Sequence, residues 1–191
     1  MVTSLLMTKY SLIIIALGLL VTSCQSASVK ETEDEMFVVN ELFLLRTEGM
    51  ALCDIASSNN PSPEIQMACE KLRNYYTGTQ EDFVYLCDGR SVALEQEDFD
   101  LIWKHLDTQL TKDSMQFEIA FIELSADNLL RSIALHELIL QRKDWEDIMY
   151  YAFKSLPELY KQQGALTQLK ESRVAEKSRE KMEVKNAALS L

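Results

Sequence analysis

The chain has 191 residues and a formal net charge of −11 at pH 7. Such a surface repels nucleic acid and anionic lipid, so we expect no DNA or RNA partner. Hydrophobic residues make up 47% of the chain, enough for one domain with a substantial core, and only 5 glycines and 3 prolines are present, which favours an all-α protein.

The first residues have the pattern of a secretory signal. Lys9 supplies a positive charge, and the apolar run SLIIIALGLLV over residues 11–21 is too short to span a bilayer as a helix. The sequence Val21-Thr22-Ser23-Cys24 then resembles the bacterial lipobox. That resemblance implies cleavage before Cys24 and acyl chains attached at this residue, which together give stable membrane anchoring. The alternative is an ordinary cleaved signal that contains a cysteine by chance.

These signals divide the chain into four expected segments. They are a signal peptide over residues 1–23, a lipid-anchored acidic linker over 24–35, a helical bundle domain over 36–169, and a charged tail over 170–191 that is either helical or disordered. We therefore expect a protein of the bacterial cell envelope, held at the membrane through acyl chains.

Two features near Cys24 bear on its location. Gln25 follows the cysteine, and its resemblance to a known bacterial sorting rule implies the outer membrane, on its periplasmic or surface face. The acidic run ETEDE over residues 31–35 is similar to surface-export marks of some lipoproteins. It is also explained by a solvated leader whose charges stabilise the positive N-terminal end of a helix.

Helical periodicity dominates the remaining sequence, with apolar residues at alternating steps of three and four. Long helices are predicted over about 33–58, 63–87, 113–141 and from 144 onward, and a shorter helix over 97–110. The turns between the first two helices and between the last two are short, which implies antiparallel neighbours. The pattern therefore predicts an antiparallel four-helix bundle with one short extra helix.

Three cysteines follow Cys24. Cys53 and Cys69 lie almost equally far from the turn near residues 60 and 61, so we expect them side by side. In an oxidising compartment they could form a disulfide, and the alternative is a pair of small buried thiols. Cys87 falls at the other end of the predicted helix, away from both, and its fate stays open.

Three motifs resemble those of one protein family. They are FVVNELFLLRTEGMALCDIAS from Phe37, FEIAF from Phe117 and AFKSLPELYKQQGAL from Ala152. In this order and spacing they resemble the bacterial envelope family called domain of unknown function 4142, over about residues 37–169. The resemblance implies a ferritin-like helical bundle.

The family tends to carry a Glu in the first helix and a His in each of three later helices, a set that looks like metal-ligand chemistry. At the matching positions this chain has Gly49, Tyr76, Leu129 and Gln162. Gly49, Tyr76 and Leu129 fall on the predicted apolar stripes. We therefore expect no metal and no cofactor at this place.

Two other kinds of site remain open. Glu48 and His136 are weak metal candidates, and an oxygen-rich site could use Glu48, Glu70, Glu118, Glu123 and Asp127. The simpler interpretation is a hydrogen-bonded core histidine and solvated carboxylates. A small-ligand pocket is also conceivable where Gly49 lacks a side chain opposite Tyr76, beside Leu129.

Catalysis has little support in the sequence. There is no Ser-His-Asp arrangement and no cysteine beside a plausible base, and two histidines offer little acid–base chemistry at neutral pH. We expect a non-catalytic envelope protein with a binding or structural role, whose partner is another envelope protein or a second copy. The alternative is a metal-binding or stress-related bundle that uses carboxylates and His136.

Overall fold

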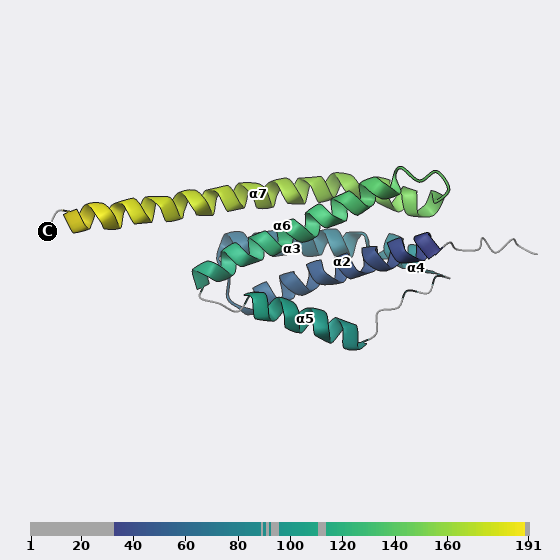
Figure 1. The fold of residues 1–191 in the computed structure, drawn as a ribbon, viewed down its shortest axis with the longest axis horizontal. Helices are drawn as coiled ribbons and strands as arrows, with labels where there is room; N and C mark the ends of the chain where they lie inside the picture. The colour runs from purple at the N-terminus through teal and green to yellow at the C-terminus, as the bar shows by residue number, and fades with distance from the viewer. Residues whose placement is uncertain (1–32, 89, 91, 93–95, 111–113, 190–191) are drawn as a thin grey trace, which may run out of the picture. The chain divides into compact units, whose positions relative to one another are not determined.

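The computed structural model describes residues 33–88, 90, 92, 96–110 and 114–189 (Figure 1). Its helices are α2 (Glu33–Ser58), α3 (Pro63–Gly78), α4 (Gln80–Cys87), α5 (Gln96–Leu110), α6 (Ser114–Ile139) and α7 (Glu146–Leu189). The prediction of an all-α protein is confirmed. The predicted signal peptide and the lipid attachment at Cys24 lie outside the described residues. Among the helices that are described, none combines the length and the apolar character needed to cross a membrane.

Four of the helix pairings form a closed ring. α2 contacts α3 and α6, and α7 contacts the same two helices. α5 lies against α2 and α6 (Figure 1). α4 contacts α7.

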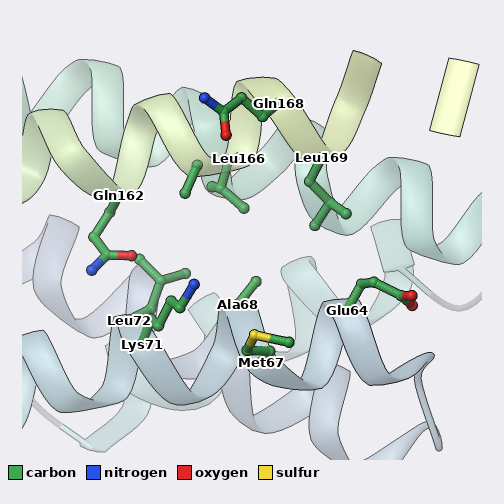
Figure 2. A pocket seen from close by; sticks show the side chains of 10 residues that line it. Glu64, Met67, Ala68, Lys71, Leu72, Gln162, Leu166, Gln168 and Leu169 are labelled. Atoms are coloured by element: carbon green, nitrogen blue, oxygen red, sulfur yellow. The ribbon is translucent and has the colours of Figure 1, made fainter. Parts of the chain in front are cut away.

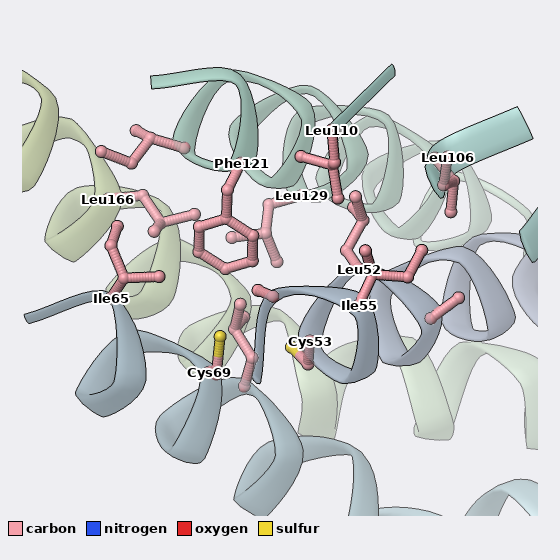
Figure 3. Close-up of a cluster of buried hydrophobic side chains, with 14 of the residues drawn as sticks. Leu52, Cys53, Ile55, Ile65, Cys69, Leu106, Leu110, Phe121, Leu129 and Leu166 are labelled. Atoms are coloured by element: carbon pink, nitrogen blue, oxygen red, sulfur yellow. The ribbon is translucent and has the colours of Figure 1, made fainter. Parts of the chain in front are cut away.

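Two clusters of buried side chains hold these helices together. The larger cluster includes Leu52, Ile65, Phe121, Leu129 and Leu166, contributed by α2, α3, α6 and α7 (Figure 3). The smaller cluster gathers residues of α2, α4, α6 and α7 with Trp145, which precedes α7. Each large side chain that is fully buried contributes about 1.5–3 kcal/mol of transfer free energy, so helix packing is the main source of stability.

The second predicted helix, over 63–87, is wrong in one respect: the structure breaks it at Thr79. Gly78 is a poor helix former, and Arg46 of α2 stabilises the break. The Arg46 guanidinium donates to the Tyr76 carbonyl oxygen and to the Thr79 hydroxyl at 2.7 Å. The Thr79 hydroxyl in turn donates to the Tyr75 carbonyl oxygen at 2.9 Å.

The described helices extend beyond both bounds of the predicted bundle domain, 36–169. α2 starts at Glu33, inside the predicted linker, and its first turn is acidic as the helix dipole favours. α7 continues to Leu189, so the tail beyond residue 170 takes the helical of its two predicted forms.

Candidate functional site

The four positions matched to the family's ligand set lie on four different helices and are all buried. They are Gly49 on α2, Tyr76 on α3, Leu129 on α6 and Gln162 on α7. Tyr76 lies directly against Gly49, because a Cβ added to Gly49 would be 1.9 Å from the Tyr76 hydroxyl oxygen. Leu129 belongs to the same core cluster as Tyr76. The Tyr76 ring thus fills the space beside Gly49, and a ligand in the predicted pocket would have to displace it.

A buried hydrogen-bond network fixes the Tyr76 ring. Its hydroxyl donates to Asn128 Oδ1 at 3.3 Å. Asn128 Nδ2 donates to the Leu45 carbonyl oxygen at 2.9 Å and to Glu48 Oε2 at 3.2 Å. Burial raises the pKa of Tyr76 above its usual range, so the hydroxyl stays protonated as a donor. The network joins α2, α3 and α6 through Asn128, which the sequence analysis had not singled out.

The two weak metal candidates have other partners in the structure. His136 is buried, and its Nδ1 lies 2.6 Å from the Ser132 carbonyl oxygen. Glu48 accepts hydrogen bonds from Arg131 and Asn128. Within the described ranges, no group of three or more His, Cys, Asp or Glu side chains could hold a metal ion.

Besides Glu48, three of the carboxylates considered for an oxygen-rich site are ion-paired. Asp127 pairs with Arg131 at 3.1 Å, Glu123 with Lys170 at 3.0 Å, and Glu118 with Arg173 at 2.9 Å. Each carboxylate faces a basic side chain, which compensates its charge without a cation from solution.

A groove lies between α3 and α7, and Gln162 is part of its lining. Two adjoining hollows, of about 300 and 450 Å³, share Lys71, Gln162 and Ala165 in their linings. We call them together the α3–α7 groove. One wall spans Glu64 to Thr79 and the other spans Lys154 to Leu169.

The two ends of the α3–α7 groove differ in chemistry. The smaller hollow is mainly apolar, and Figure 2 shows Leu166 and Leu169 of α7 facing Ala68 and Leu72 of α3. The larger hollow carries three lysines, Lys71, Lys154 and Lys161.

The groove's three lysines are differently engaged. Lys154 pairs with Asp82, and Lys161 pairs with Glu158 at 3.0 Å. Lys71 forms no ion pair with any residue that the structure describes. Its ammonium group is therefore the one best placed to attract an anion, next to the apolar hollow that it also lines.

Comparison of the chain with protein-family models, curated proteins and solved structures gives no match. The likeness to the envelope family therefore rests on the sequence motifs alone.

Proposed function

We propose that this protein is a lipid-anchored, non-catalytic binding protein of the bacterial envelope, built on a divergent ferritin-like four-helix bundle. The lipobox-like sequence ending in Cys24 supports the anchor. The ring of contacts among α2, α3, α6 and α7, with α5 outside it, supports the bundle.

The α3–α7 groove is the proposed binding site, and its ligand is a small amphipathic anion such as a long-chain fatty acid. The observation that carries this proposal is the apolar hollow of about 300 Å³ that continues into a lysine-lined hollow of about 450 Å³. Both volumes are in the range of small-molecule sites, which are mostly apolar with a few convergent polar groups.

Charge supports the same ligand class. The chain as a whole has a net charge of −11, so long-range electrostatics disfavour anions over most of its surface. Glu64 and Glu158 also line the groove, and Lys154 and Lys161 are ion-paired, so the charge open to an anion is that of Lys71, which lies beside the apolar hollow on which an acyl chain would pack.

The core network supports binding without a metal. Tyr76 fills the space at Gly49, and its hydroxyl is bonded to Asn128. Gly49 and Tyr76, which match two of the family's possible metal-ligand positions, thus form a packed contact between α2 and α3 in this chain. The α3–α7 groove next to it offers a surface on which a ligand can bind.

The test is a fluorescence titration of the full chain with parinaric acid, followed by competition with palmitate and with hexadecanol. We expect palmitate to displace the probe and the uncharged alcohol to do so much less well. Ala165→Trp fills the shared part of the groove at an exposed position, so it should abolish binding without disturbing the core.

Charge reversal provides the matched control. Lys71→Glu should weaken palmitate binding by roughly tenfold, because it replaces an attraction by a repulsion. Lys104→Glu changes the net charge equally on the exposed face of α5 and should bind as the wild type does. No probe binding by the wild type, or equal binding by Ala165→Trp, would show that the groove is not the site.

A further inference from the structure

Two cysteines meet in the larger core cluster, away from the α3–α7 groove's ligand surface. Cys53 of α2 and Cys69 of α3 are each 0% exposed, and both are free thiols in the structure. The two thiols are close enough for each to shift the pKa of the other. Figure 3 shows the two sulfur atoms at the contact between the helices.

We propose that Cys53 and Cys69 form a disulfide that covalently ties α2 to α3. The contact is between neighbouring helices that join through the short turn after Ser58 and before Pro63. Cys87 does not compete for either sulfur, because it packs on the smaller cluster at the end of α4.

The surroundings make the two sulfurs chemically unequal. The hydrogen bond from Cys53 lowers the pKa of Cys69, and the charge of Arg73 acts in the same direction. That hydrogen bond, together with burial, raises the pKa of Cys53. Arg73 is held in place because it donates to the Cys53 carbonyl oxygen at 3.0 Å and pairs with Asp54 at 2.6 Å. Cys69 is therefore the more readily deprotonated sulfur of the pair, and we assign it the role of attacking thiolate.

The reaction needs a small disulfide as oxidant, of the class of oxidised glutathione. Both cysteines are 0% exposed in the folded chain, so the oxidant reaches Cys69 only when α2 and α3 part in a local opening. The Cys69 thiolate then attacks one of the oxidant's sulfurs, forms a mixed disulfide and releases one small thiolate. Cys53 then loses its proton and attacks the Cys69 sulfur, which releases the second small thiolate. Two protein thiols are oxidised, one small disulfide is reduced to two thiols, and the two protons go to the released thiolates.

The disulfide would restrain α3 locally and would raise the stability of the whole fold. It closes a ring through the α2–α3 turn, and it fixes α3, which is one wall of the groove, against α2. A ring of this length removes enough freedom from the unfolded chain to raise the melting temperature by roughly 6–12 °C.

The experiment uses the full chain, purified without reductant and equilibrated with reduced and oxidised glutathione. The protein is unfolded, alkylated and digested with trypsin. Both cysteines then fall in one peptide, Thr47 to Lys71, and cleavage after Glu64 separates them. We expect this peptide to be unalkylated and lighter than the dithiol by two hydrogen atoms, and to remain linked after the second cleavage.

Three serine variants serve as controls. Cys53→Ser should leave Cys69 open to alkylation, Cys69→Ser should do the same for Cys53, and Cys87→Ser should keep the linked peptide. The melting temperature of the wild type and of Cys87→Ser should fall on reduction, while that of the other two should not change. Full alkylation of Cys53 and Cys69 in oxidised wild type, or a bridge that includes Cys87, would overturn the proposal.

Discussion

His136 makes the fold sensitive to acid. Its ring is buried between α6 and α7, 5.8 Å from the ring of Tyr151, and Nδ1 is bonded to the Ser132 carbonyl oxygen at 2.6 Å. That contact places the proton on Nδ1, and Nε2 has no hydrogen-bond partner among the described residues. A second proton would put an uncompensated positive charge into the core.

Burial accordingly lowers the pKa of His136 from 6.5 to about 4. Because the folded pKa lies below the unfolded one, the stabilising contribution is complete above the unfolded pKa and is lost as the pH falls through 6.5 towards 4. The full difference corresponds to about 3 kcal/mol, of which about 2.5 kcal/mol is lost between about pH 7.5 and about pH 4.5.

The assay is urea denaturation of the full chain at these two pH values. Carboxylates also titrate in this range, so the informative quantity is the difference between the wild type and His136→Gln. We expect the wild type to lose about 2.5 kcal/mol more than this variant on acidification. His105→Gln is the matched control, because His105 is exposed on α5 and bonds Gln109. Equal acid sensitivity of the wild type and His136→Gln would refute the reasoning.

Two further predictions concern Gly49 and Cys24. Gly49→Ala should lower the free energy of unfolding by about 2 kcal/mol, since overpacking against Tyr76 outweighs the gain of about 1 kcal/mol in helix propensity. In a Tyr76→Leu background the same change should cost little, and a double-mutant cycle without coupling would disprove the contact. Cys24→Ser should abolish acylation and leave the chain unprocessed or released, as metabolic labelling and membrane fractionation would show; a mature, lipid-associated variant would contradict the lipobox interpretation.

The apolar periodicity of the sequence predicted the helices, except where a contact with a residue distant in the chain ends one of them. The bounds of α2 were predicted because its apolar stripe and its terminal signals lie within its own sequence. The break at Thr79 was missed because it depends on Arg46, which is 33 residues away in the chain. A buried arginine between Leu45 and Thr47 does not stand out in a hydrophobic pattern.

In the candidate site too, features set by nearby residues could be predicted from the sequence, and features set by distant contacts could not. The meeting of Cys53 and Cys69 followed from their equal spacing about one turn, whereas the bond from Asn128 to Leu45 spans 83 residues and no local pattern reports it. The α3–α7 groove arises from incomplete packing of two helices. Lys154 and Lys161 are one heptad apart on α7, a spacing that the sequence analysis did not take up.

The pair between Arg173 and Glu118 marks a boundary in α7. Arg173 also donates to Ser62 at 2.6 Å, and it contacts Glu64 at 3.3 Å. Residues 174–179, which follow it, are all exposed, although the helix continues to Leu189. The helical segment from residue 174 to Leu189 would be only marginally stable as an isolated helix in water. In this chain it continues a helix whose preceding turns are packed on the core. Backbone amides beyond Arg173 should therefore open in fraying events that leave the core intact, giving the chain a second, lower level of local stability.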